Sequence, residues 1–357
     1  MANLDDPKAY QKLDPSNMIA RIGAMAQQCR QAWNSAIASP LPSNYTDVDK
    51  IIILGMGGSA IGGDMVATLA TTQSAIPVVV HKDYLLPEWV DERTLVIASS
   101  YSGNTEETIS AFSQALETPA KKLAITTGGR LQELAAKNSV PLFVFHYKAE
   151  PRAAFGYSFF SILAFLQNLD LITIEPKHVD EATSVLDELS AAWDKTVPLE
   201  SNPAKQLAND LFNRFVVIYG AGILSKVAYR WKTQLNECSK TWASAEAFPE
   251  LNHNTVVGYD FPKNISELAF VVMLRPALLQ HRLQIRFDVT CELLDKAGIP
   301  HAIVEAEGKS HLSQLMSTVL FGDYVSYYLA ILNDIDPSPV KAIDYLKAKL
   351  ASCSDTP

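Results

Sequence analysis

Short apolar runs that recur with helical segments between them constrain the fold of this 357-residue chain more than any other feature. The first run, Ile51-Ile52-Ile53-Leu54, has no polar residue at alternate positions, as expected for a parallel strand that is covered on both faces. Four similar runs follow in the first half, at residues 76–80, 95–98, 122–126 and 142–145. Strands that alternate with helices in this way predict a doubly wound α/β domain.

The second half of the chain repeats this pattern. The run at 215–219 leads into Gly220-Ala221-Gly222, and further runs lie at 268–274 and 300–304. We therefore predict a second α/β domain of the same architecture, in line with an internal duplication. The predicted divisions are a helical N-terminal segment at 1–45, a first α/β domain at 46–155, a helical crossover at 156–205, a second α/β domain at 206–310, and C-terminal helices at 311–357. Single helices are expected at 15–38, 310–334 and 340–350.

The charge balance narrows the range of partners. A net charge of −9 argues against nucleic acid or an anionic membrane as the main partner, although a local pocket can still bind an anionic small molecule. The N-terminus has no apolar secretory segment, and no run reaches the roughly 18 apolar residues of a membrane helix. A cytoplasmic protein with reduced thiols is expected, since the cysteines are far apart in the sequence: Cys29, Cys238, Cys291 and Cys353.

A glycine motif, GMGGSAIGGD at residues 55–64, follows the first strand and opens a helix. Backbone amides and the positive end of the helix favour an anion there, and glycines allow a close approach. Gly55, Gly57 and Ala60 also fit the loose dinucleotide fingerprint, but Asp83 comes late for its ribose-binding acid. By itself the motif leaves open a tight turn in which the glycines serve packing alone.

A second motif, SSYSGNTEET at residues 99–108, places many hydroxyls where the third strand ends and a helix begins. Ligands of open α/β sheets bind at the carboxyl ends of the strands, and hydroxyls there can surround a compact dianion. The alternative is that Ser102 or Asn104 only caps the helix. Capping does not need so many hydroxyls, so the two motifs together favour a terminal phosphate group. The predicted phosphate-binding residues are Gly57, Gly58, Ser59, Ser100, Ser102 and Thr105.

These two motifs resemble the sugar isomerase (SIS) fold of phosphosugar-binding proteins. Other segments, in the same order along nearly the whole chain, resemble the bifunctional phosphoglucose/phosphomannose isomerases: PRAAFGY at 151–157, Asn236-Glu237, FPELNHN at 248–254, GDYVSYY at 322–328 and DPSPV at 336–340. The resemblance implies two SIS domains, a homodimer, and an aldose–ketose isomerase of hexose 6-phosphates that needs no metal or cofactor.

Such an isomerisation needs a base, a group that opens the sugar ring, and positive charge near the enediolate oxygens. The resemblance implies that Glu237 is the base, that Arg152 stabilises the enediolate, and that His253 opens the ring in the active site of the neighbouring subunit. Without the resemblance, Glu237 would be read as a solvated helix residue, Arg152 as part of a structural salt bridge and His253 as a surface residue.

Several points stay open from the sequence alone. Lys347 resembles the family's C-terminal lysine, another ring-opening residue, but Lys349 is a close rival. The family often carries Thr at the position of Ser338, which leaves the activity on mannose 6-phosphate in question. Two other functions compete: a phosphosugar-binding sensor or regulator without catalysis, and a nicotinamide-dependent oxidoreductase built on the glycine motif. No histidine spacing typical of zinc sites occurs, so no metal is expected.

Overall fold

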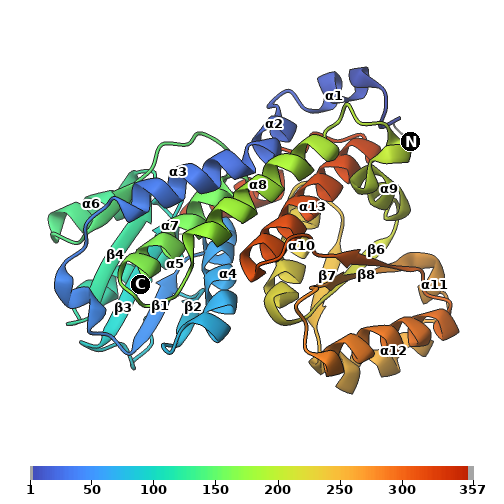
Figure 1. Cartoon of the computed structure of the whole chain (residues 1–357). Helices are drawn as coiled ribbons and strands as arrows, with labels where there is room; N and C mark the ends of the chain where they lie inside the picture. The colour runs from blue at the N-terminus through green and yellow to red at the C-terminus, as the bar shows by residue number, and fades with distance from the viewer. Residues whose placement is uncertain (1–2, 353–357) are drawn as a thin grey trace.

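Two parallel sheets flanked by helices form the frame of the computed structural model, which describes residues 3–352 (Figure 1). The first sheet has the strand order β2-β1-β3-β4-β5. Its strands are β1 (Lys50–Leu54), β2 (Val78–His81), β3 (Thr94–Ser100), β4 (Lys121–Thr126) and β5 (Leu142–Val144). The second sheet has the order β7-β6-β8-β9. Its strands are β6 (Phe215–Gly220), β7 (Ala243–Ala247), β8 (Ala269–Arg275) and β9 (His301–Glu305). The predicted α/β fold class with two parallel sheets is confirmed.

The all-apolar sequence of β1 reflects burial on both faces of the first sheet. Ile51 and Ile53 pack into one hydrophobic cluster, whereas Ile52 and Leu54 pack into another. Alternate residues of a strand point to opposite faces, so helices must cover both sides of this strand.

Helices make up most of the remaining chain. They are α1 (Pro7–Leu13), α2 (Met18–Gly23), α3 (Met25–Ile37), α4 (Gly57–Gln73), α5 (Glu106–Leu116), α6 (Gly129–Lys137), α7 (Phe155–Asn168), α8 (Pro176–Ala192), α9 (Pro203–Asp210), α10 (Ser225–Glu237), α11 (Ile265–Leu268), α12 (His281–Ala297), α13 (His311–Leu332) and α14 (Lys341–Ser352). Cys353 and the end of the predicted C-terminal segment, 353–357, lie outside the described residues.

The single helix predicted at 15–38 is wrong, because the segment breaks at Ala24 into α2 and α3. Gly23 ends α2 at a close packing point, where an added Cβ would lie 3.4 Å from the Tyr324 hydroxyl of α13. Glycine is also a weak helix former, so the break falls where both the local preference and the packing favour it.

Helix α13 is the central core helix and packs against α8, α9 and α10. It is long and apolar enough to cross a membrane, but its apolar window is wholly buried inside the protein, which is typical of a core helix. Asp323 is the one Asp, Glu, Lys or Arg residue in α13, and it is 2% exposed. A lone carboxylate in such a helix needs a partner, and the partner is described with the candidate site.

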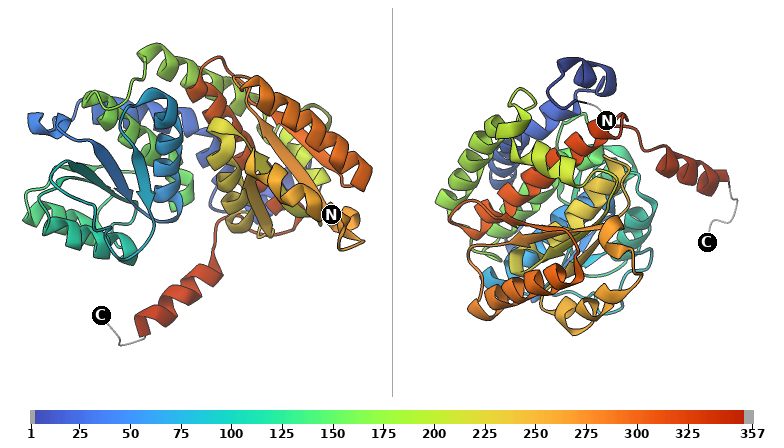
Figure 2. Two further views of the ribbon diagram at one scale, coloured as in Figure 1. Left: turned by 90° about the horizontal axis from the view of Figure 1, so that it is seen from below. Right: turned by 90° about the vertical axis from the view of Figure 1, so that its right-hand side faces the viewer.

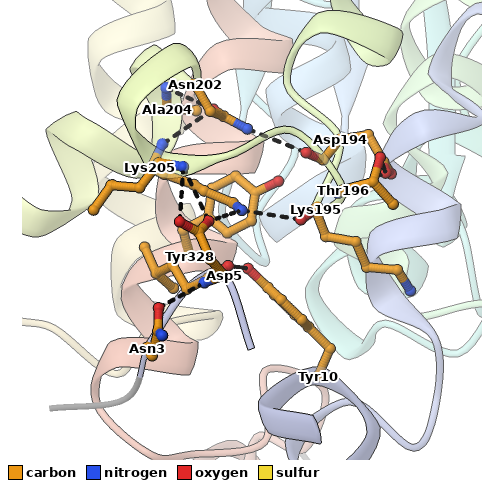
Figure 3. Close-up of polar contacts among 12 residues, drawn as sticks. Asn3, Asp5, Tyr10, Asp194, Lys195, Thr196, Asn202, Ala204, Lys205 and Tyr328 are labelled. Carbon is orange, nitrogen blue, oxygen red and sulfur yellow. Dashed lines mark hydrogen bonds and ion pairs between the residues drawn. The ribbon is translucent and has the colours of Figure 1, made fainter. Parts of the chain in front are cut away.

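The N-terminal segment is fastened to the second half of the chain by a buried lysine (Figure 3). The Lys205 side chain is 0% exposed, and its ammonium lies 2.9 Å from an Asp5 oxygen and donates to the Lys195 carbonyl at 2.9 Å. The ammonium also lies 5.9 and 5.7 Å from the ring centroids of Tyr10 and Tyr328. A buried ammonium is costly without such compensation, so Asp5 holds the N-terminal segment in place.

We expect Asp5→Asn to lower the free energy of unfolding by on the order of 1–2 kcal/mol at pH 7, below the loss for a fully buried pair because the Asp5 side chain is 41% exposed. The hydrogen bond from Lys205 holds the pKa of Asp5 below its usual value. The stabilisation is therefore complete above about pH 4 and is lost as the pH falls through the lowered pKa. Urea unfolding at a series of pH values measures both effects.

The matched control is Asp187→Asn, which removes a more exposed pair with Arg30. This surface change should cost about 0.5 kcal/mol or less. Equal stability of the Asp5 and Asp187 variants at pH 7 would show that the Lys205 pair does not anchor the N-terminal segment.

Candidate active site

The two sequence motifs meet at the carboxyl edge of the first sheet. Strands β1 and β3 are parallel neighbours, with Leu54 in register with Ala98, so the loops that follow them lie side by side. The Ser59 hydroxyl accepts a hydrogen bond from the Tyr101 backbone N–H at 3.1 Å and ties the two loops together. The six predicted phosphate-binding residues are thus gathered at one edge of one sheet; their binding role remains a prediction.

Glycines shape the first turn of α4. Gly57 has a φ of +51°, a conformation that favours glycine, and it begins the helix without a side-chain cap. An added Cβ at Gly58 would lie 3.0 Å from the Pro151 carbonyl oxygen and 3.3 Å from the Arg152 nitrogen. Gly58 therefore lets the start of α4 lie directly against the segment that carries Arg152.

The hydroxyls of the second motif bond mainly to their own loop. The hydroxyls of Ser100 and Thr105 lie 2.9 Å apart, and the Ser102 hydroxyl accepts from the Asn104 backbone N–H at 3.2 Å. Thr105 is the N-cap residue of α5, but its side chain makes no capping bond. Ser102 and Asn104 are therefore not the N-cap residue of α5, and the binding role of the hydroxyls stays a prediction.

Arg152 and Glu237 come from different halves of the chain and lie together. Arg152 belongs to the 3₁₀ turn η2 (Pro151–Ala154), and Glu237 is the last residue of α10. A guanidinium Nη1 lies 3.7 Å from a Glu237 oxygen; Arg152 is 4% exposed and Glu237 is 30% exposed. This separation is longer than a hydrogen bond, so the carboxylate is not locked to the guanidinium, and a substrate oxygen beside the pair can contact both groups.

Backbone carbonyls of the C-terminal linker fix the guanidinium of Arg152. Its Nη2 donates to the carbonyls of Pro337 at 2.7 Å and Ser338 at 2.6 Å. Its Nε and the Ser338 hydroxyl are buried with no partner among the described residues. Lys240 also donates to the carbonyls of Glu237 at 2.6 Å and Pro337 at 3.3 Å, and burial lowers the pKa of its ammonium. The site therefore combines two cations with one accessible carboxylate.

The residues that support this pair were not predicted from the sequence. The Arg230 Nη2 lies 3.0 Å from an Asp323 oxygen and donates to the Arg152 carbonyl at 3.0 Å. Gln234 donates to the same Asp323 carboxylate at 2.7 Å. Arg230, Gln234 and Glu237 lie four and three residues apart on α10, so they share one helix face. This spacing on α10 and the single Asp in the apolar helix α13 are the sequence features that could have pointed to these supporting residues.

The other two predicted catalytic residues lie apart from this pair. His253 ends the 3₁₀ turn η5 (Glu250–His253) and is exposed, and Lys347 and its rival Lys349 lie on the exposed helix α14. Among residues 3–352, no group of three His, Cys, Asp or Glu side chains could hold a metal ion. A single chain thus assembles the arginine and the glutamate of the predicted site without the ring-opening residues.

Comparisons with known proteins agree with a fold of two α/β domains. The SIS domain family matches residues 44–173, and the bacterial phospho-glucose isomerase C-terminal SIS domain matches residues 200–350. The solved structure of a hypothetical protein from Thermus thermophilus has a TM-score of 0.73 and 16% identity, covering 97% of this chain and 93% of that chain. The fold and the two family matches define a protein with two SIS domains.

Curated relatives identify the family. The chain is 44% identical over 341 residues to a bifunctional phosphoglucose/phosphomannose isomerase of Caldicellulosiruptor bescii, covering 95% of this chain and 100% of that protein. It is 37% identical over 303 residues to a protein of the same name from Thermoplasma acidophilum, covering 84% of this chain and 89% of that protein. The chain belongs to the bifunctional phosphoglucose/phosphomannose isomerase family, and it is an aldose–ketose isomerase, as the sequence motifs predicted.

Proposed function

We propose that this isomerase interconverts glucose 6-phosphate and mannose 6-phosphate with fructose 6-phosphate. The observation that carries the proposal is the Arg152–Glu237 pair, which lies beside the first turn of α4 and therefore next to the predicted phosphate cradle. The names of the curated relatives support the same substrates. A sensor without catalysis would not need an accessible carboxylate beside a fixed arginine.

The phosphate of the substrate binds at Ser59, Ser100 and Thr105, and the C1–C2 edge of the sugar lies against both Arg152 and Glu237. Glu237 removes the proton from C2 of the open-chain aldose, and the electron pair moves into the C1–C2 bond as the carbonyl becomes an enediolate oxygen. The fixed guanidinium of Arg152 stabilises that oxygen. The O2 proton then moves to O1, Glu237 returns its proton to C1, and the electrons of the C1–C2 double bond form the new C1–H bond while O2 becomes the ketose carbonyl. Glucose and mannose 6-phosphates differ at C2 alone, so both give the same enediolate.

Ring opening is assigned to His253 of a neighbouring subunit and to a lysine of α14, with Lys347 favoured over Lys349. His253 is exposed at the end of η5, a position from which it can reach another subunit. An imidazole can exchange a proton near pH 7. The proposal thus includes a homodimer in which each site is completed by its partner.

Two assays in D₂O test the proposal. Both start from fructose 6-phosphate; one measures the glucose 6-phosphate formed and the other measures the mannose 6-phosphate formed. The proton held on Glu237 can exchange with solvent before it is returned, so deuterium should appear at C2 in part of both products. Formation of neither aldose would refute the proposed function. Formation of both with complete retention of the C1 hydrogen would refute solvent exchange at Glu237 and favour a direct hydride shift.

Loss of a hydroxyl from the phosphate cradle should weaken substrate binding. For Ser59→Ala and Thr105→Ala, we expect KM for fructose 6-phosphate to rise roughly tenfold, since a hydrogen bond to a charged group contributes about 1.5–3 kcal/mol. Steady-state kinetics measure this change, and kcat should move less than KM. Ser113→Ala is the control, because the Ser113 hydroxyl bonds to the Ile109 carbonyl within α5. Equal KM values in all three variants would place the phosphate elsewhere.

A further inference from the structure

Lys240 follows α10 and binds the backbone of the candidate active site. Its ammonium donates to the Glu237 carbonyl at 2.6 Å, and it makes longer contacts with the carbonyls of Cys238 at 3.4 Å and Pro337 at 3.3 Å. An ammonium has three N–H donors, so these three carbonyls can take up all of them. None of the proposed isomerisation steps uses this lysine.

The backbone of Lys240 indicates that its side chain is retained for these contacts. Lys240 has a φ of +56°, in the left-handed region that glycine and asparagine adopt more readily. The residue is exposed, so packing in a core does not require a long side chain there. A residue that stays in a strained conformation points to a functional constraint. For Lys240, that constraint is the set of three carbonyls.

Glu237 is the last residue of α10, a position where a helix frays easily. The last four carbonyls of a helix have no partner within it, and α10 has no basic residue in its last turn. Lys240 supplies a cation to these carbonyls, which also complements the negative end of the helix dipole. The lysine therefore fixes the backbone from which the Glu237 side chain extends.

The same ammonium holds the C-terminal linker. The Pro337 carbonyl accepts from Lys240 and also from the Arg152 Nη2, at 2.7 Å. Beyond the linker, α14 projects from the body of the protein in both views of Figure 2, and none of its described side chains is buried. Within one chain, contacts at the linker itself therefore fix its position. Through Pro337, Lys240 is joined to the backbone that orients the Arg152 guanidinium.

We propose that Lys240 is a positioning residue for the isomerisation, because its ammonium joins the end of α10, which carries Glu237, to the carbonyl that orients Arg152. This inference rests on the proposed function, in which Glu237 is the base. The Glu237 carboxylate is 3.7 Å from Arg152, too far for a hydrogen bond to fix it, so its backbone must supply the precision. A displacement of about 1 Å at a reacting group can lower the rate roughly a hundredfold.

Lys240→Gly is the main test, because it removes the ammonium and suits the left-handed backbone. We expect kcat to fall roughly 10–100-fold, measured by coupled kinetics. KM for fructose 6-phosphate should change by less than about threefold, since the phosphate cradle is untouched. The urea midpoint should stay close to that of the wild type, because relief of the backbone offsets the lost bonds of an exposed side chain.

A second pair of variants separates the charge from the side-chain bulk. Lys240→Arg keeps a cation with enough donors for the same carbonyls, whereas Lys240→Met keeps an extended side chain without one. Both leave the left-handed backbone as it is. We expect Lys240→Arg to retain kcat within about fivefold of the wild type and Lys240→Met to lose as much as Lys240→Gly.

Two control variants match these changes away from the site. Ser139→Gly makes the glycine change at another exposed residue with a left-handed backbone, where φ is +55°. Lys226→Met removes an exposed lysine in the first turn of α10. Both should leave kcat and KM unchanged.

Four results would overturn the positioning role of Lys240. They are an unchanged kcat in Lys240→Gly, a rise in KM without a fall in kcat, equal losses in the Arg and Met variants, and a loss of kcat that is matched by a lower urea midpoint in Lys240→Gly. The proposed function fails separately, through the Glu237→Gln variant. If that variant stayed active, Glu237 would not be the base; if it were inactive while Lys240→Gly kept full activity, only the role of Lys240 would be refuted.

Discussion

We expect Glu237→Gln to lower kcat by about a thousandfold, while fructose 6-phosphate still binds. Proton transfer by a positioned side chain contributes roughly 10²–10⁴-fold to the rate, and glutamine has the shape of glutamate without a basic oxygen. Arg152 and the phosphate cradle are untouched by the change, so the ligand keeps its main charged contacts. Coupled kinetics measure kcat, and isothermal titration with fructose 6-phosphate measures binding.

The control for this variant is Glu292→Gln, the same chemical change on the exposed face of α12. It should leave kcat and binding unchanged. If Glu237→Gln retained roughly a tenth or more of the wild-type turnover, another group would be the base. If it lost binding together with turnover, Glu237 would serve to hold the substrate or the fold.

The strands that carry the site were predictable where burial on both sheet faces required continuous apolar sequence. Strand β1 is the clearest case, because Ile51 to Leu54 supply both hydrophobic clusters. Strand β7 was missed, since its sequence Ala-Ser-Ala-Glu-Ala lacks β-branched and aromatic residues. It forms through backbone pairing with β6, and Ala243 is its one fully buried residue. Pairing of this kind leaves little trace in the side-chain pattern.

The candidate site was predictable as far as motifs name its residues. Arg152 and Glu237 were named through family resemblance, and the fold brings them together. Arg230 and Asp323 were missed, because the spacing on α10 and the lone Asp in α13 indicate partners but not which residues pair, which depends on how α10 packs against α13. His253 and Lys347 were also named through the resemblance; both are exposed, and their role in ring opening stays a prediction.

Asp323→Asn should cause the largest loss of stability among single changes at this site, about 3–5 kcal/mol. The substitution leaves the buried Arg230 guanidinium without its carboxylate partner. It also takes away a buried negative charge that interacts with Arg152. Arg230 cannot avoid the cost of an unpaired buried charge by losing its proton, because arginine stays protonated in proteins. Because proteins of this kind have total stabilities of about 5–15 kcal/mol, the loss should be evident as a lower urea midpoint.

Arg230→Met should cost less than Asp323→Asn, although both break the same ion pair. Burial raises the pKa of Asp323, and Arg230 opposes that rise. Without Arg230, Asp323 can bind a proton in the folded state and become neutral, an escape that arginine lacks. The folded-state pKa then lies above the unfolded value of about 3.9, so the stability of Arg230→Met should fall as the pH rises above about 4. Urea unfolding between pH 4 and pH 8, with Arg275→Met as the exposed ion-pair control, measures this slope. A flat profile with equal losses for Asp323→Asn and Arg230→Met would show that Asp323 is not held ionised by Arg230.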